Sequence, residues 1–303
     1  MRNFAIETVG LTYKFGSQTV VKDLSLQVPQ GSIYGFLGPN GAGKTTTIKI
    51  LLNLLKSPSD QVFIFGKEIN SNRIASLKHM GSLVEQPAIY AHLTGKENLI
   101  NRAMLLGINK AKCAEMLSLV GLTDAANKKA GQYSLGMKQR LGIALALISD
   151  PELLLLDEPT NGLDPNGIIE IRNLMIDLTT KHGKTILVSS HLLAEIEKTA
   201  THVGIINNGE LLFQGTIGEL HDLSKPSVKI ETDHTQKAAT ILETAGIEVI
   251  SKDEHQLSVA FNTKEEMGNV NTLLVQNDIT VFSIGKERKD LENLFLDITS
   301  KNQ

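Results

Sequence analysis

The sequence predicts an α/β fold whose core is a largely parallel sheet covered by helices, followed by a smaller α+β domain. Two apolar runs, IYGFL (33–37) and LLLLD (153–157), have the length of fully buried strands. Two further strand-like runs, TILVSS (185–190) and VGIINNG (203–209), follow later in the chain. Helix-like segments alternate with these strands, and strands that alternate with helices form a largely parallel sheet.

A mainly helical segment, about residues 87–150, separates the first strands from LLLLD. Thr94 and Glu97 have the spacing of a capping box, in which each side chain binds the other residue's backbone N–H. Gly121 is expected to end a later helix in this segment. We therefore expect a helical subdomain inside a first domain that spans 1–222.

The pattern changes near residues 223–227, where a Lys-Pro pair flanked by serines indicates a linker. The following elements are predicted in order: strand 228–232, helix 235–245, strand 247–251, strand 256–261, helix 264–277 and strand 279–284. This is the ferredoxin-like order. A last amphipathic helix is predicted around Leu291, Leu294, Phe295 and Ile298. Residues 223–303 are therefore expected to form an accessory or regulatory domain.

Composition excludes several classes of protein. With 303 residues, 41% of them hydrophobic, the chain can bury a large core, and its net charge of −3 gives no basic field for nucleic acid. The one cysteine, Cys113, lies among apolar residues and excludes an intramolecular disulfide. Glu7 interrupts the place of a signal peptide, and no apolar run approaches the ~18 residues of a membrane span. We expect a cytoplasmic chain without membrane insertion, so work at a membrane would need another protein.

A glycine-rich loop after IYGFL carries the strongest chemical signal. GPNGAGKT fits the pattern G-x-x-x-x-G-K-[ST], in which glycines let backbone N–H groups face phosphate oxygens. Lys44 is expected to reach the β- and γ-phosphates of a nucleotide, and the Thr45 hydroxyl to bind Mg²⁺. The predicted phosphate-binding residues are Gly38, Pro39, Asn40, Gly41, Ala42, Gly43, Lys44, Thr45 and Thr46.

Two carboxylates end the apolar strand LLLLD. Asp157 is placed to hold the Mg²⁺ shell, and Glu158 to orient or deprotonate the attacking water. A solvated acidic turn is the alternative. Because unpaired charge at the end of a buried strand is costly, a catalytic pair explains the carboxylates better.

Three more motifs narrow the class. YSLGMKQR (133–140) lies between the glycine-rich loop and LLLLDEP, NGLD (161–164) follows Glu158 closely, and His191 follows TILVSS. In this order and spacing the motifs resemble the ABC ATPase family over about residues 1–220. The resemblance implies a P-loop NTPase cassette, a mixed sheet core with a helical subdomain, that binds and hydrolyses ATP with Mg²⁺.

The family signature reads close to LSGGQ, and here it is YSLGM. The resemblance implies that Ser134 and Gly136 contact the γ-phosphate held by the opposite subunit, while Leu135 and Met137 depart from the pattern. It also assigns Asp164 to the nucleotide site and His191 to a γ-phosphate contact that helps arrange water and Glu158. Read alone, SLGM is a helix cap.

An aromatic residue is expected to stack on adenine. Phe15 precedes Gly16 and lies where the family places that ring; Tyr13 is the competing candidate, and a core strand position is the alternative for both.

The segment GSLVEQPAIY (81–90) departs from the family in an informative way. Many members place here a glutamine that joins the metal site to the membrane partner. Counting along the segment places Glu85 at that position and Gln86 one residue later. Glu85 is expected to touch Mg²⁺ or its water as an oxygen ligand and is counted among the catalytic residues. A solvated loop glutamate is the alternative.

A glutamate at this place, the YSLGM signature and the long C-terminal extension together resemble one branch of the family: ATPase subunits of transporters that protect bacteria from bacitracin or lantibiotics. The resemblance implies a homodimer that binds two ATP molecules and drives a separate membrane permease. It also implies a place at the inner face of the bacterial membrane through that permease. ATPase subunits of other drug, ion or lipid exporters remain an alternative.

Other classes of nucleotide-binding protein fit less well. A P-loop kinase would not need YSLGM together with His191. A nucleic-acid-acting ABC ATPase usually has two cassettes or a long coiled coil, which this sequence lacks. A non-hydrolysing module would be expected to lose Glu158 or His191.

Overall fold

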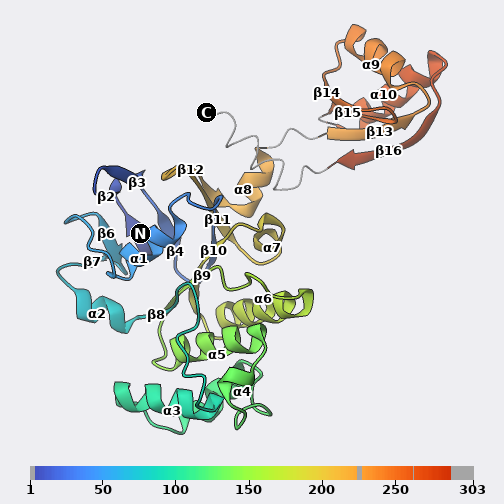
Figure 1. Cartoon of the computed structure of the whole chain (residues 1–303). Coiled ribbons are helices and arrows are strands. Elements are labelled where there is room, and N and C mark those ends of the chain that lie inside the picture. The colour runs from blue at the N-terminus through green and yellow to red at the C-terminus, as the bar shows by residue number, and fades with distance from the viewer. Residues whose placement is uncertain (1–3, 224–226, 262, 288–303) are drawn as a thin grey trace. The chain divides into compact units, whose positions relative to one another are not determined.

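The computed structural model describes residues 4–223, 227–261 and 263–287. The chain divides into two compact units, Met1–Ile217 and Gly218–Gln303 (Figure 1). Helix α8 (Ile217–Asp222) begins at this division. The terminal helix predicted around Leu291, Leu294, Phe295 and Ile298 lies outside the described residues.

A six-stranded sheet forms the centre of the first unit, in the order β12-β11-β5-β10-β9-β8. The strands are β5 (Ile33–Leu37), β8 (Met80–Leu83), β9 (Leu153–Asp157), β10 (Thr185–Ser190), β11 (His202–Asn207) and β12 (Glu210–Thr216). Neighbours are parallel except β11 and β12, which are antiparallel. Every residue of β5, β9 and β10 is buried, which explains why these strands are continuous apolar runs. The predicted α/β fold with a mixed sheet is confirmed.

Shorter antiparallel strands complete the core. They form the sheet β4-β1-β6-β7 and the hairpin β2-β3. Their bounds are β1 (Phe4–Thr8), β2 (Leu11–Phe15), β3 (Gln18–Leu24), β4 (Gln27–Pro29), β6 (Val62–Ile64) and β7 (Lys67–Glu68). Leu24, Leu26 and Val28 are all buried in one apolar cluster with Phe36 of β5 and Ile48. The period-two pattern of these three residues therefore marks the face that joins the small sheet to the central one.

Helix α1 (Lys44–Leu51) ends at Leu51, although apolar residues at helical spacing continue to Leu55. Asn53 adopts a left-handed backbone with φ 53°, a conformation that ends helices. The N–H groups of Leu54 and Leu55 then both donate to the carbonyl of Lys49. Leu55 still packs against the core, but from the loop and not from the helix.

A group of helices lies at one end of the first unit (Figure 1). The helices of this unit are α1, α2 (Arg73–Lys78), α3 (Gly95–Leu106), α4 (Lys112–Leu119), the 3-10 helix η1 (Ala130–Gln132), α5 (Leu135–Leu147), α6 (Pro165–Thr180) and α7 (Leu193–Glu197). Helices α3, α4 and α5 pack against one another. The capping box of Thr94 and Glu97 is present, and its hydrogen bonds lower the pKa of Glu97.

Close backbone packing places α5 directly on β8. A Cβ atom on Gly81 would lie 2.3 Å from the carbonyl oxygen of Ala146, so only glycine allows this approach. The loop that follows β8 therefore starts from a strand fixed both by α5 and by its pairing with β9.

The second unit has the predicted strand–helix–strand–strand–helix–strand order. Its elements after α8 are β13 (Ser227–Thr232), α9 (Thr235–Thr244), β14 (Val249–Lys252), β15 (Gln256–Ala260), α10 (Lys264–Gln276) and β16 (Val281–Glu287). The sheet order is β14-β15-β13-β16, with all neighbours antiparallel. This unit has its own apolar core, which includes Val228, Ile230, Leu242, Leu257 and Leu274.

Candidate functional site

The glycine-rich loop connects β5 to α1 through a backbone that only glycine permits at two points. A Cβ atom on Gly38 would lie 2.3 Å from the carbonyl oxygen of Ile206, and Gly43 has a φ of 107°. Gly43 is the N-cap residue of α1 and has no side chain that could accept a hydrogen bond from the first turn. Because the first N–H groups of a helix lack intrahelical partners, this terminus can bind an anion such as a phosphate.

The side chain of Lys44 folds back onto this glycine-rich loop (38–45), which we call the phosphate loop. Its ammonium donates to the carbonyl oxygens of Gly38 at 2.7 Å and of Pro39 at 3.3 Å. The Nζ atom is also 3.3 Å from Oε1 of Glu158. The side chain is only 6% exposed, so its charge is concentrated at the phosphate loop and not dispersed into solvent.

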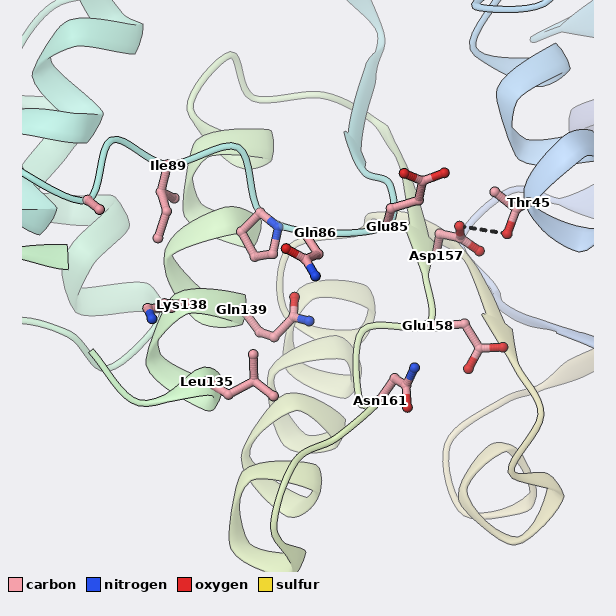
Figure 2. Close-up of a pocket in the computed structure, with 12 residues that line it drawn as sticks. Thr45, Glu85, Gln86, Ile89, Leu135, Lys138, Gln139, Asp157, Glu158 and Asn161 are labelled. Atoms are coloured by element: carbon pink, nitrogen blue, oxygen red, sulfur yellow. Dashed lines mark hydrogen bonds between the residues drawn. The ribbon is translucent and has the colours of Figure 1, made fainter. Parts of the chain in front are cut away.

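Asp157, at the end of β9, is joined to the phosphate loop and to the neighbouring strand. Thr45 Oγ1 donates to Asp157 Oδ2 at 2.9 Å (Figure 2). Ser189 Oγ donates to Oδ1 of the same carboxylate at 2.6 Å. The carboxylate is 2% exposed. Strands β5 and β9 both pair in parallel with β10, so their carboxyl ends lie at the same edge of the sheet. This brings the Asp157 carboxylate close to the Thr45 hydroxyl.

The oxygen atoms of Thr45 and Asp157 fit a magnesium ion bound with a nucleotide. Mg²⁺ prefers oxygen ligands and commonly binds through one or two protein groups, with phosphates and water completing the octahedron. Among the described residues no group of three or more His, Cys, Asp or Glu side chains could form a closed metal cage. The donor set therefore suits a metal ion that arrives with phosphate.

Glu158 is held by contacts on three sides. Its backbone N–H donates to Ser189 Oγ at 2.9 Å, its Oε1 faces Lys44, and its Oε2 is 2.7 Å from Nδ1 of His191. A carboxylate only accepts hydrogen bonds, so Nδ1 of His191 carries the hydrogen in this contact. The backbone of Glu158 has φ 49°, a strained value for a residue with a side chain. The surrounding contacts maintain this conformation beside the phosphate loop.

Two cavities meet at this edge of the sheet. One, of about 360 Å³, follows the phosphate loop and reaches His191. The other, of about 530 Å³, lies below the loop after β8 and reaches Gln139 on α5 (Figure 2). Thr45, Glu158 and Asn161 line both. A group bound at the phosphate loop is therefore close to whatever the loop after β8 presents.

The structure places Glu85 and Gln86 on the same cavity but on different sides. Glu85 lies toward Thr45 and Asp157, whereas the amide of Gln86 points toward Gln139 (Figure 2). Glu85 has φ 60° and a side chain that is 63% exposed. Its carboxylate forms an ion pair with Lys49 of α1, with 2.6 Å between Nζ and Oε1. Of the two residues, Glu85 is the one on the Thr45 and Asp157 side of the cavity, although its carboxylate is turned to Lys49.

The signature residues and Asp164 act as helix caps within their own chain. Ser134 Oγ accepts the Met137 N–H at 3.2 Å at the start of α5, and Asp164 Oδ1 accepts the Gly167 N–H at 3.2 Å at the start of α6. A Cβ atom on Gly136 would lie 3.8 Å from Cδ2 of Leu163, an ordinary van der Waals distance, so packing within the chain does not require glycine here. These residues do not reach the phosphate loop of their own chain through any hydrogen bond among the described residues.

Phe15 and Tyr13 stack edge to face, with ring centroids 5.1 Å apart. Tyr13 packs against the apolar core, while Phe15 is half exposed. Phe15 is thus the more exposed of the two rings.

Sequence analysis overlooked Ser189, Gln139 and Lys49. Ser189 is opposite Asp157 in the parallel register, which a pairing of the two apolar strands could have indicated. Gln139 is buried, and its Oε1 has no hydrogen-bond partner among the described residues. Lys49 lies one helical turn after Thr45, and no sequence pattern links it to Glu85.

Comparison with known proteins decides the family. A model of the ABC transporter family matches residues 21–161. The bacitracin transport ATP-binding protein BcrA of Bacillus licheniformis is 44% identical over 294 residues, which cover 96% of each chain. The chain belongs to the ABC transporter ATP-binding proteins. This ABC protein is therefore an ATP-binding and ATP-hydrolysing transporter subunit, as its motifs predicted.

Further relatives agree with this assignment. The BcrA protein of Enterococcus faecalis is 39% identical over 96% of this ABC protein and 95% of its own length. The lantibiotic transport ATP-binding protein SrtF of Streptococcus pyogenes is 39% identical over 67% of this chain and 87% of its own. These relatives match the branch that the sequence resembled.

Solved structures agree as well. An ATP-binding subunit of an ABC transporter superimposes with a TM-score of 0.64 at 29% identity, covering 72% of this chain and 92% of that one. A dimeric cassette bound to ADP and Pi gives a TM-score of 0.62 at 25% identity, covering 70% and 98%. Within the described residues, none of the helices has the length and apolar character needed to cross a bilayer.

Proposed function

We propose that this ATPase subunit powers a transporter that protects a bacterium from a peptide antibiotic of the bacitracin or lantibiotic type. The observation that carries the proposal is the similarity to BcrA, which extends over 96% of both chains and so includes the second unit. SrtF, a lantibiotic transport protein, supports the same class of substrate through the first unit.

In the proposed catalytic cycle, ATP lies along the phosphate loop with its adenine against Phe15. Lys44 neutralises the β- and γ-phosphates, and Thr45 and Asp157 hold the Mg²⁺ that accompanies them. Magnesium supplies charge neutralisation of the phosphates. Glu158 accepts a proton from the attacking water or orients it, and the contact with His191 fixes the carboxylate for this task. Glu85 approaches the metal or its water from the loop after β8.

Two copies of the chain are proposed to complete each site. Ser134 and Gly136 start a helix, and a helix N-terminus favours an anion, yet they make no hydrogen bond to their own phosphate loop among the described residues. A second copy that presents this terminus to the γ-phosphate gives a homodimer with two ATP molecules. The related dimeric cassette bound to ADP and Pi supports this arrangement. Closing and opening of the dimer would then move the permease.

The partner is proposed to be a permease of the same transporter, which would hold the subunit at the inner face of the membrane. We assign residues 1–222 to the ATPase and 223–303 to an accessory domain that acts on dimer stability or regulation. Independent cores support this division. A variant lacking 224–303 should remain folded and bind ATP; a folded variant without ATP binding would contradict the division.

Drug resistance tests the proposed transport function directly. The chain is expressed with its candidate permease in a host sensitive to bacitracin and to a lantibiotic, and inhibitory concentrations are measured. Wild type should raise the inhibitory concentration of at least one peptide, whereas the matched Glu158→Gln variant should not. Equal sensitivity with wild type and variant, although the wild-type complex hydrolyses ATP, would contradict a role in peptide-antibiotic protection.

A further inference from the structure

The side chain of Lys49 connects the helix of the phosphate loop to the loop after β8. Its ammonium lies 2.6 Å from Oε1 of Glu85, and the two residues are far apart in sequence. Lys49 is 33% exposed and Glu85 63%, so solvent screens this pair in part. An amide in place of Glu85 would leave this ammonium without its counter-charge.

Helix geometry places the same ammonium close to the proposed metal site. Thr45 and Lys49 are four residues apart on α1 and therefore lie on one face of the helix. Thr45 donates to Asp157, and Glu85 lies on the cavity that both residues line (Figure 2). Glu85 is thus on the same cavity as the oxygens of Thr45 and Asp157, while its carboxylate is paired with the ammonium of Lys49.

We propose that Lys49 is a positioning residue that retains the Glu85 carboxylate, so that Mg²⁺ must compete with an ammonium to recruit it. The proposal rests on the metal role proposed for Glu85. Both cations attract the same carboxylate, and an ammonium in contact weakens its attraction for a second cation. The Lys49–Glu85 pair then belongs to the metal-free site, and arrival of Mg²⁺ with ATP loosens it and frees the loop after β8.

The strained backbone of Glu85 agrees with this role. A residue with a side chain adopts φ 60° only where surrounding contacts compensate for the strain. Among the described residues, Lys49 is the hydrogen-bond and ion-pair partner of the Glu85 side chain. Loss of the pair therefore lets the loop relax, which couples metal binding to the position of the loop.

Binding of a non-hydrolysable ATP analogue, measured against Mg²⁺ concentration, tests the proposal without turnover. Lys49→Gln should lower the Mg²⁺ midpoint by about 3- to 10-fold, because the competing cation is gone. Glu85→Gln should raise the midpoint, since an amide binds Mg²⁺ more weakly than a carboxylate. The double variant should match Glu85→Gln, because Lys49 acts through Glu85.

Two control variants separate this effect from general charge loss. Lys49→Arg keeps the cation and should keep the wild-type midpoint. Lys22→Gln removes a surface lysine that pairs with Glu210 at 3.3 Å and should also leave the midpoint unchanged. Circular dichroism melting curves confirm that each variant is folded.

Chemical labelling of lysine gives a second measurement that does not depend on affinity. Lys49 should react slowly with an amine-directed reagent in EDTA and faster with Mg²⁺ and the analogue, as read by mass spectrometry. In Glu85→Gln it should react fast in both conditions. Equal reactivity of Lys49 in wild type and Glu85→Gln under EDTA would overturn the proposal.

The outcomes distinguish this inference from the function on which it rests. If Glu85→Gln raises the midpoint but Lys49→Gln leaves it unchanged or raises it, Glu85 contacts the metal and the competition is wrong. If Lys49→Gln lowers the midpoint equally in the Glu85→Gln background, the lysine acts as a general charge and the competition is wrong. If Glu85→Gln has no effect, the metal role of Glu85 fails, and the inference fails with it.

Discussion

The two edges of the nucleotide site are held in different ways. At the ends of β9 and β10, Asp157 and Glu158 are fixed by hydrogen bonds from Thr45, Ser189 and His191, and Asp157 is almost fully buried. Across the cavity, Glu85 is mostly exposed and held by one ion pair. We refer to these as the fixed edge and the loop edge. Groups that carry out chemistry need a fixed position, whereas a group that signals binding needs two positions of similar free energy.

The largest effect on ATP hydrolysis is expected from a substitution at the fixed edge. Glu158→Gln should lower ATP hydrolysis at least ~10²-fold, because the proton acceptor is lost while the phosphate loop remains. Equilibrium binding of ATP should persist, and ATP-bound dimer should accumulate on size-exclusion chromatography. Turnover close to wild type would remove Glu158 from its catalytic role.

Lys44→Ala should mainly weaken nucleotide binding, by roughly 10-fold or more, because it removes a charge-assisted hydrogen-bond donor facing the phosphates. Isothermal titration with ATP measures this loss. The melting temperature should change little, because the ammonium serves loop carbonyls and Glu158 and not the apolar core. Unchanged affinity together with unchanged turnover would contradict the assignment of the phosphate loop.

Ser189→Ala breaks the link between the Asp157 carboxylate and the Glu158 backbone at the fixed edge. The Ser189 hydroxyl donates to Oδ1 of Asp157 and accepts from the Glu158 N–H, so its loss removes the partner of one buried carboxylate oxygen and of one backbone N–H. Unfolding free energy should fall by about 1–3 kcal/mol, and turnover should fall as the carboxylates lose their alignment. Ser190→Ala, one residue later, is the matched control. Equal effects of the two variants would show that Ser189 has no special part in the fixed edge.

The smallest effect, a change in stability alone, is expected for Asp150, which lies near the opposite end of β9 and β10. Lys184 donates to Asp150 at 2.7 Å, and this hydrogen bond lowers the pKa of Asp150, with a smaller charge effect from Lys112. A lowered pKa in the folded state stabilises the protein above the unfolded pKa of about 3.9, and this stabilisation is lost as pH falls through the lower folded value. Because Asp150 is largely exposed, the contribution is about 0.2–1 kcal/mol.

The matched measurement is thermal unfolding of wild type and Asp150→Asn between pH 7 and pH 3. The difference in melting temperature should be constant above about pH 5 and shrink below about pH 4. ATP turnover at pH 7 should be equal in both proteins. A difference that grows as the pH falls would contradict the sign of the pKa shift.

Sequence patterns predicted the parts of the molecule that depend on local order. The apolar runs became buried strands, and the capping box of Thr94 and Glu97 is present because its two hydrogen bonds join residues three apart. The end of α1 could not be read in this way, because apolar residues continue to Leu55 and such a pattern cannot show that Asn53 adopts a left-handed backbone.

Contacts between distant segments were beyond sequence reasoning. The Ser189 bridge depends on strand register, and the Lys49–Glu85 pair depends on how a loop returns to α1. Both lie where the motif residues come together, so the sequence predicted which residues gather at this edge of the sheet but not how they are held. The nucleotide roles of Ser134, Gly136, Asp164 and Phe15 stay predictions, as do the metal roles of Thr45, Asp157 and Glu85.

ATP hydrolysis measured against Mg²⁺ concentration, for wild type, Glu158→Gln, Glu85→Gln and Gln86→Ala, tests the contrast between the two edges most directly. Glu158→Gln should remain nearly inactive at every Mg²⁺ concentration. Glu85→Gln should shift the curve to higher Mg²⁺ while keeping much of the maximal rate, because an amide oxygen binds Mg²⁺ more weakly than a carboxylate. Gln86→Ala should follow wild type. A shifted curve for Gln86→Ala with an unshifted one for Glu85→Gln would show that Gln86, and not Glu85, contacts the metal. A loss of ATP hydrolysis in Glu85→Gln as large as in Glu158→Gln would contradict the separation of a fixed edge from a loop edge.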